Sequence, residues 1–426
     1  MNILRSLLVY FVIAAICPAL NATDVYLRLM AHGQRVDVGV AGFVPASPTM
    51  DESKYARQIQ EILRYDLLFA RYFNILDEGP LYTGKDEEIK SWADQGADML
   101  VCGKISINLK NIEVDVQLFD TESRQIIWEK TFTGTTGDWR RLAHEINDEL
   151  IMRITGERGI AHTRIVFSNN VSGSKELYTI DYDGGNLMRM TDDKSINLLP
   201  CWSPDGKEIV YTTYRFGNPD LCGISCNADR RRVISQRQGL NTAASFSPDG
   251  NTIALTISRG KTPALYLIKR SGEIIRQLTF GNAAATSPSF APNSREIAYI
   301  SDDPGYPQLY IMNIEGGNNR RLPARGYCDS PAWSPRGDRI VFTMRQGRGD
   351  NRYDLYVYAL AEGTISRLTQ NEGDNENPSW SPDGRFIVFS STRSGRSQLY
   401  IAAADGSGAR KLGSIPGNSS TPDWSP

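Results

Sequence analysis

One short motif occurs six times between residues 202 and 426 of this 426-residue chain. It reads Trp-Ser-Pro-Asp-Gly at residues 202–206, and successive copies begin at aromatic residues that lie 43 to 47 positions apart. These aromatic residues are Trp202, Phe246, Phe290, Trp333, Trp380 and Trp424. Repeats of this length are typical of the four-stranded blades of a β-propeller.

The residues around each motif predict the strands of one blade. Ser-Pro-Asp-Gly at 203–206 is the order that a type I turn favours. An alternating β-branched run follows each turn, as in Ile253–Thr256, and a Leu-aromatic pair lies twelve residues after the isoleucine, as at 265–266. A Leu-Thr pair, as at 278–279, ends the unit. Each repeat therefore predicts four strands.

The strand count predicts a closed ring. Residues 165–168 and 177–178 match the second and third strands of a blade but lack an aromatic first strand. Residues 421–426 supply such a first strand. We predict a six-bladed β-propeller over residues 163–426 in which the C-terminal strand completes the first blade, because such closure hides the sheet edges.

Residues 24–160 carry no repeat and mix helical with strand patterns. Thr49 to Glu52 form a capping box before a helix with apolar residues at helical spacing. Further helices are predicted at 87–95 and 138–154, and strands at 36–44, 73–76, 99–105, 112–119 and 126–132. We predict a compact N-terminal α/β domain at residues 23–157, which Gly156–His162 link to the ring.

Residues 1–22 have the pattern of a secretory signal peptide. Arg5 precedes an apolar run, Leu7–Ile16, that is too short to span a bilayer, and small or polar residues lead to Ala22. A buried N-terminal helix is one alternative. A lipoprotein anchored at Cys17 is another, although Ile16 is a poor match to the small residue that lipoprotein processing prefers before the cysteine. We expect the mature protein in an exported compartment.

Composition argues against several classes of function. The formal net charge is −2, so the chain has no electrostatic footprint for nucleic acid. Five cysteines follow the signal, an odd number that shows no disulfide framework. Cys222 and Cys226 are four residues apart, which is roughly 13 Å along a strand and beyond disulfide reach. We expect buried thiols.

A propeller enzyme is the main rival hypothesis, and a glycan- or peptide-binding propeller is another. A propeller peptidase needs a Gly-x-Ser-x-Gly elbow, which the sequence lacks. The three histidines, His32, His144 and His162, all precede the ring, so a histidine-based metal or acid–base site in its channel is excluded. Asp181–Gly184 superficially resembles a calcium loop, but a hairpin turn explains it without metal. We expect no cofactor.

The export signal, the α/β domain, the six blades and the final Trp-Ser-Pro strand together resemble the TolB family, the periplasmic components of the Tol–Pal system. The resemblance covers the chain from its signal almost to its end. It implies a non-catalytic, monomeric scaffold that binds the lipoprotein Pal through the propeller and TolA through the mature N-terminus. It also implies a role in outer-membrane integrity and cell division, and allows other outer-membrane proteins as partners.

The resemblance also suggests the partner-binding residues. In the family, loops that lead into each aromatic strand face Pal. The corresponding residues here are Asn241, Thr242, Thr286, Ser287, Asp329, Ser330, Asn375 and Glu376. Polar turns of purely structural use remain the alternative, because loop residues are commonly polar. The TolA segment is expected at Thr23–Ala31, where an alternating pattern suits a strand that docks on a sheet edge. Its residues are Asp24, Val25, Tyr26, Leu27, Arg28 and Leu29.

Overall fold

The computed structural model describes residues 35–47, 49–258, 262–347 and 352–426. Its contacts divide the chain into two compact units, the first ending at Gly159 and the second beginning at Ile160. The expected signal peptide and the expected TolA segment, Asp24–Leu29, lie outside the described residues. None of the described helices combines the length and the apolar character that a membrane-spanning helix needs.

The first unit is built on a five-stranded sheet with strand order β2-β1-β3-β4-β5. Strands β2 and β3 pair parallel to β1, whereas β4 pairs antiparallel to β3 and to β5. The strands are β1 (Val36–Pro45), β2 (Phe73–Leu76), β3 (Met99–Asn108), β4 (Asn111–Asp120) and β5 (Gln125–Thr135). The long β3–β4–β5 meander exceeds the predicted strands by a few residues at its ends.

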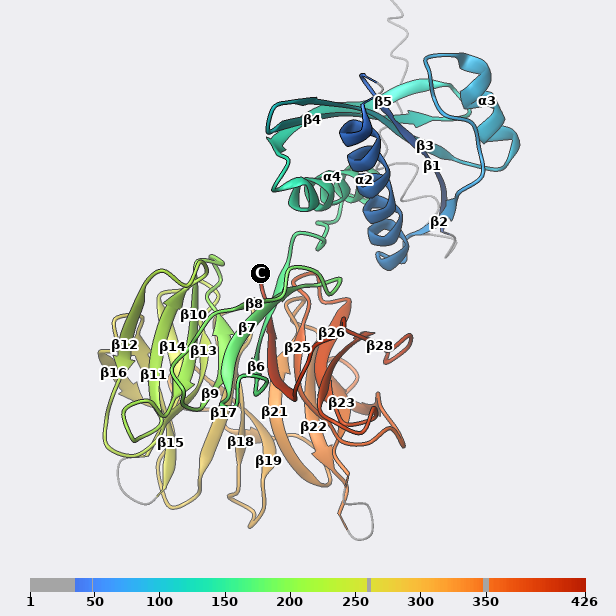
Figure 1. Cartoon of the computed structure of the whole chain (residues 1–426). Coiled ribbons are helices and arrows are strands. Elements are labelled where there is room, and N and C mark those ends of the chain that lie inside the picture. Colours follow the sequence, from blue (N-terminus) through green and yellow to red (C-terminus); the bar gives the residue numbers. More distant parts are fainter. Residues whose placement is uncertain (1–34, 48, 259–261, 348–351) are drawn as a thin grey trace, which may run out of the picture. The chain divides into compact units, whose positions relative to one another are not determined.

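Helices cover both faces of this sheet (Figure 1). Helices α2 (Met50–Phe69) and α4 (Trp139–Thr155) pack on one face and share its main apolar core. Helix α3 (Asp86–Asp94) covers part of the other face, where Trp92 is buried. Thr49 caps α2 as predicted, because its hydroxyl accepts a hydrogen bond from the Glu52 N–H at 3.2 Å.

The second unit is a six-bladed β-propeller, as predicted, and each blade is a four-stranded sheet (Figure 1). The innermost strands contact one another around the ring. They are β9 (Asn197–Trp202), β13 (Asn241–Phe246), β17 (Ala285–Phe290), β21 (Tyr327–Trp333), β25 (Asn375–Trp380) and β29 (Ser419–Trp424). The second strands are β6 (Arg164–Asn169), β10 (Glu208–Thr213), β14 (Thr252–Ser258), β18 (Glu296–Ser301), β22 (Arg339–Arg345) and β26 (Phe386–Ser391).

The outer half of each blade is formed by a third strand and a short fourth strand. The third strands are β7 (Glu176–Asp181), β11 (Asp220–Ser225), β15 (Pro263–Lys269), β19 (Gln308–Asn313), β23 (Asp354–Ala359) and β27 (Gln398–Ala403). The fourth strands are β8 (Met188–Arg189), β12 (Arg231–Ser235), β16 (Ile274–Gln277), β20 (Arg320–Arg321), β24 (Thr364–Arg367) and β28 (Arg410–Lys411).

The C-terminal strand closes the ring. Strand β29 pairs antiparallel with β6, in the sheet β29-β6-β7-β8, with Trp424 opposite Ile165. The indole N–H of Trp424 donates to the Thr163 hydroxyl at 2.8 Å, and the Arg164 N–H donates to the Ser425 hydroxyl at 2.9 Å. The first and last residues of the ring therefore share one blade, and the edge of β6 that faces the channel is covered by β29.

The repeated aromatic residues build the core between blades. Trp380 is 6% exposed and packs with Val341 and Leu355 of the preceding blade and with Phe389 of its own. Each motif turn also has its predicted geometry: the Gly206 N–H donates to the Ser203 carbonyl at 2.9 Å, and Gly206 has a φ of 66°. The hairpin at Asp181–Gly184 forms the same way, with the Gly184 N–H donating to the Asp181 carbonyl at 2.9 Å.

Candidate functional site

A β-bulge interrupts every inner strand of the propeller. Each inner strand shifts register against the second strand of its blade, two to three residues before the aromatic residue. The first bulged residue has a left-handed backbone, with φ between 48° and 53°. We call these the bulge residues: Leu199, Ala243, Ser287, Ser330, Asn377 and Thr421. Bulges bend a strand and re-aim its side chains.

The bulges surround a cavity on the propeller axis. The cavity holds about 170 Å³ and is lined by three consecutive residues from each of the six inner strands. The lining comprises the bulge residues and the two residues that follow each of them, up to Cys201, Ser245, Ser289, Ala332, Ser379 and Asp423. The lining is therefore dominated by small and proline side chains, which leave the channel open.

The side chain of the third lining residue in several inner strands connects neighbouring blades. The Ser289 hydroxyl accepts a hydrogen bond from the backbone N–H of Trp333 in the next blade at 2.9 Å, and Ser245 does the same for Phe290 at 3.2 Å. Ser379 accepts from the Trp424 N–H at 3.1 Å. These bonds join one aromatic residue after another around the channel.

Asp423 is the acidic member of this series. Its carboxylate accepts the Trp202 N–H at 2.7 Å and the Ser379 hydroxyl at 2.9 Å. Burial in the channel wall raises the pKa of Asp423 to about 6, although these two hydrogen bonds favour the charged form. The side chain keeps some accessible surface because it borders the axial cavity.

We call the ring face on which the inner strands begin the rim face. The hairpins between second and third strands and the connections from each fourth strand to the next inner strand also lie there, because neighbouring strands in each blade are antiparallel. The Asn241 N–H donates to the Pro219 carbonyl of the preceding blade, and Cys328 and Asn375 make the same bond to Pro307 and Tyr353. The blades are thus tied together at this face.

Two of the predicted rim residues lie beneath the surface instead. Asn241 and Asn375 are fully buried. The Asn375 amide donates to Asp354 Oδ1 at 3.1 Å, and the Asn241 amide oxygen accepts the Ser235 hydroxyl at 2.6 Å. Their side chains therefore hold the loops from below.

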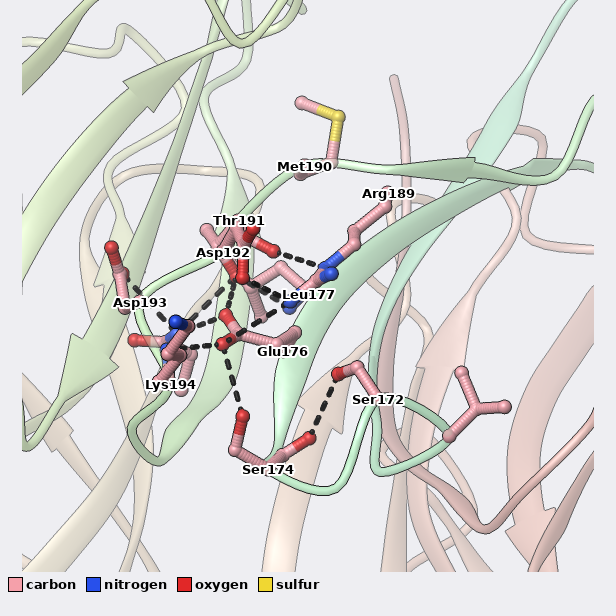
Figure 2. A network of polar contacts seen from close by, with 12 residues as sticks. Ser172, Ser174, Glu176, Leu177, Arg189, Met190, Thr191, Asp192, Asp193 and Lys194 are labelled. Atoms are coloured by element: carbon pink, nitrogen blue, oxygen red, sulfur yellow. Dashed lines mark hydrogen bonds and ion pairs between the residues drawn. The ribbon is translucent and has the colours of Figure 1, made fainter.

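Figure 2 shows the equivalent network in the first blade. The fully buried Glu176 accepts hydrogen bonds from the Thr191 hydroxyl at 2.5 Å and from the Lys194 N–H at 2.7 Å (Figure 2). The Asn197 amide, which is in the same position as Asn375, donates to Glu176 at 2.9 Å. A buried acid, a threonine and an asparagine thus join a blade to the next inner strand.

Of the six other predicted rim residues, two line the axial cavity and four lie one residue before a bulge residue. We call the end of the cavity beside these four residues its mouth. Ser287 and Ser330 are bulge residues, and the Ser287 hydroxyl donates to Asp329 at 3.3 Å. Thr242 is half-buried and shares a hydrogen bond of 3.0 Å with Thr212 of the preceding blade. Thr286 and Glu376 are half-buried as well, and Asp329 is exposed.

Asp329 and Glu376 give the mouth an acidic side. They occupy equivalent positions on β21 and β25, one residue before the bulge. Surrounding protein atoms raise the pKa of both carboxyl groups, and repulsion from Asp374 and Asp329 raises that of Glu376 further. Two neighbouring blades thus present carboxylates that would gain from a cationic group of a partner.

The sequence carries a signal for the bulges. A proline lies two residues before the aromatic residue in five of the six copies: Pro200, Pro288, Pro331, Pro378 and Pro422. A proline inside a strand marks an edge or a bulge. Ala244 is the equivalent residue in the remaining copy.

Comparisons with known proteins agree with both units. The family described as "TolB beta propeller domain" matches residues 151–348 and 323–426, and "TolB amino-terminal domain" matches residues 31–127. Two curated proteins named Tol-Pal system protein TolB are 35% identical (Desulfosudis oleivorans) and 36% identical (Geobacter sulfurreducens). These alignments cover 54% and 49% of this chain and 55% and 49% of the relatives, so the chain spans about half the length of the curated relatives it matches.

A solved structure extends the similarity of fold over nearly the whole chain. The crystal structure of TolB from Acinetobacter baumannii aligns with a TM-score of 0.77 at 24% identity, covering 92% of this chain and 97% of that one. A nidogen/laminin complex also aligns, with a TM-score of 0.52 at 11% identity, over 62% of this chain and 98% of that one. Because the propeller family alone matches residues 151–426 and the amino-terminal family precedes it, this chain belongs to the TolB family.

Proposed function

We propose that this protein is a non-catalytic periplasmic scaffold of the Tol–Pal system. In this proposal the rim face of the propeller binds a Pal-type lipoprotein, and the mature N-terminal segment binds TolA. The scaffold would help to maintain outer-membrane integrity and envelope constriction during cell division. The curated relatives carry the name of this system.

The observation that carries the proposal is where apolar side chains are exposed. Seven large apolar side chains between 37% and 77% exposed lie on the loops and strand starts of the rim face: Val171, Ile196, Tyr214, Phe216, Phe280, Tyr306 and Tyr327. Exposed apolar side chains, five of them aromatic, gathered on one face of a protein are typical of a surface that docks another protein.

The chemistry of the channel supports a binding role over catalysis. Asp423 is the one carboxylate among the residues that line the described cavity, and it is engaged by Trp202 and Ser379. Burial raises the pKa of the Cys201 thiol, which disfavours a nucleophilic thiolate. The sequence has no histidine after His162. Both oxygens of Asp423 are engaged in bonds between blades, which favours a structural use of this carboxylate.

A binding experiment tests the rim. The soluble domain of the Pal-type lipoprotein from the same organism is titrated into the purified protein in a calorimeter. We expect binding that Phe280→Ser and Phe216→Ser each weaken, because both side chains are exposed on the rim face. Val233→Ser is the matched control, since Val233 is 45% exposed on the outer strand β12. The proposal would be contradicted if the purified protein bound and turned over glycans or peptides but did not bind the Pal-type domain.

A deletion tests the N-terminal segment. Removing residues 23–32 should abolish capture by the purified soluble domain of TolA. The melting temperature of the ring should hardly change, since the described contacts of the ring closure and of the cores between blades come from residues after 160. A simultaneous collapse of the ring would show that the segment is structural.

A further inference from the structure

Three tyrosines and one arginine form a cluster on the rim face, between the fourth and fifth blades. Tyr327 starts β21 and is paired across the strands with Arg345 at the end of β22. Tyr306 comes from the hairpin before β19, and Tyr353 immediately precedes β23. The Tyr306 and Tyr327 rings are 5.8 Å apart at their centroids. Two blades therefore contribute to one aromatic surface.

The Arg345 guanidinium is held between two of these rings. Its central carbon lies 4.8 Å from the Tyr327 ring centroid and 5.4 Å from that of Tyr353. Tyr353 is itself anchored, because its N–H donates to Asp374 at 3.0 Å and its carbonyl accepts the Asn375 N–H at 2.7 Å. Stacking on aromatic faces fixes the plane of the guanidinium and leaves its edge available for hydrogen bonding.

Arginines at comparable places in other blades are used differently. Arg393 follows β26 and bonds to Glu372 at 2.8 Å and to Asn375 at 3.0 Å. Arg215 follows β10 and bonds to Asp193 at 3.3 Å. Within the described ranges, Arg345 has contacts to the tyrosine rings but no side-chain hydrogen bond or ion pair. It is thus an oriented cation whose donor fork has no partner among the residues that the structure describes.

We propose that Arg345 binds a carboxylate of the partner protein that docks on the rim face. The planar fork matches a carboxylate in a bidentate geometry, and tyrosine with arginine is the composition of residues that dominate protein interfaces. The cluster complements the acidic side of the mouth, where Asp329 lies two residues from Tyr327. The partner should therefore place an acidic group opposite Arg345 and a basic group near Asp329 at the mouth. This inference rests on the proposed function.

The test uses the full chain and the soluble Pal-type domain in the same calorimetric titration. Arg345→Met keeps the apolar stem and should weaken binding about 10- to 100-fold, because a hydrogen-bonded charge pair is lost. Arg345→Lys should recover only part of the affinity, since an ammonium lacks the fork. Arg230→Met is the matched control: Arg230 has an 86% exposed side chain on a hairpin at the opposite face, and the substitution should leave affinity unchanged.

A charge-reversal experiment then identifies the partner group. Arg345→Glu is tested against a set of single Asp→Arg and Glu→Arg variants of the partner domain, and at least one should restore binding. If wild-type binds while Arg345→Met binds equally well, or if no partner variant restores binding to Arg345→Glu, the carboxylate proposal is wrong and the rim proposal stands. If the wild-type protein does not bind the domain at all, both proposals fall.

Discussion

The backbone N–H of Trp202 donates a hydrogen bond to the Asp423 carboxylate across the closure of the ring, at 2.7 Å between N and Oδ2. The two residues are 221 positions apart in the sequence, yet they lie on adjacent inner strands, β9 and β29. The carboxylate also accepts the Ser379 hydroxyl at 2.9 Å, so it connects the closing strand to both neighbouring blades. A carboxyl group with a raised pKa at this junction predicts that the stability of the folded protein depends on pH.

We expect the stability of the protein to increase as the pH falls from 7 to 5, to the extent that Asp423 contributes. The pKa of Asp423 is about 6 in the folded protein and 3.8 ordinarily, so the folded state binds the proton more tightly between these values. Stability therefore decreases as the pH rises through this window. Asp423→Asn removes the dependence, and the free energy of unfolding of wild-type relative to this variant should improve by roughly 1–3 kcal/mol between pH 7 and 5.

Urea unfolding of both proteins at several pH values measures this difference, because other titrating groups cancel in the comparison. Glu362→Gln is a suitable control, since this exposed carboxylate lies on the outer hairpin between β23 and β24. If the free energy of unfolding changed with pH in the same way for wild-type and Asp423→Asn, the pKa of Asp423 would not be raised by folding.

The hydroxyl of Ser289 should stabilise the protein through its hydrogen bond to the Trp333 N–H of the next blade. In Ser289→Ala the Trp333 N–H loses its acceptor in a half-buried hydrogen bond, which should cost about 0.5–1.5 kcal/mol. Chemical denaturation should show this loss, whereas Ser271→Ala on an exposed hairpin should change stability by less than about 0.5 kcal/mol. Equal stabilities of the two variants would mean that the interblade bond contributes nothing measurable.

Proline should be tolerated at Ala244. Five inner strands carry proline at this second bulge position, and the ladder between β13 and β14 skips residues 243 and 244. Ala244→Pro should therefore stabilise the protein by about 0.4–1 kcal/mol by restricting the unfolded chain. Ala254→Pro, in the middle of β14 and paired on both sides, should instead prevent folding. Thermal melting distinguishes the two results.

Four of the cysteine thiols should react slowly in the native state. Burial raises the pKa of Cys102 and Cys328 to about 12 and that of Cys222 to about 11, and it also raises that of Cys201. All five described cysteines are free, including Cys222 and Cys226. At pH 8, alkylation followed by mass spectrometry should modify Cys226, which is partly exposed, before the three buried thiols of Cys102, Cys222 and Cys328. Rapid labelling of Cys102 or Cys328 would contradict their burial.

The sequence determined the architecture because each blade is defined by local patterns. The Ser-Pro-Asp-Gly turn, the β-branched run and the buried aromatic residue act within about 45 residues, and their repetition predicts the ring and its closure by Thr421–Pro426. The α/β domain was equally readable: Thr49 and the helical spacing after it predicted α2, which spans Met50–Phe69.

Only the tertiary structure decided which residues face the channel and the rim. Asn375 and Glu376 are adjacent in the sequence and equally polar, yet the first is buried against Asp354 and the second lies at the mouth. Alternation along a strand gives two faces, but a bulge in each inner strand shifts the pattern, and neighbouring blades determine which face is covered. Likewise, Arg345 and Arg393 look alike in the sequence and both lie over tyrosine rings, but packing shows that, among the described residues, only Arg393 also pairs with a carboxylate, that of Glu372. Local interactions specify strands and turns, whereas burial and charge pairing depend on residues that meet only when the ring closes.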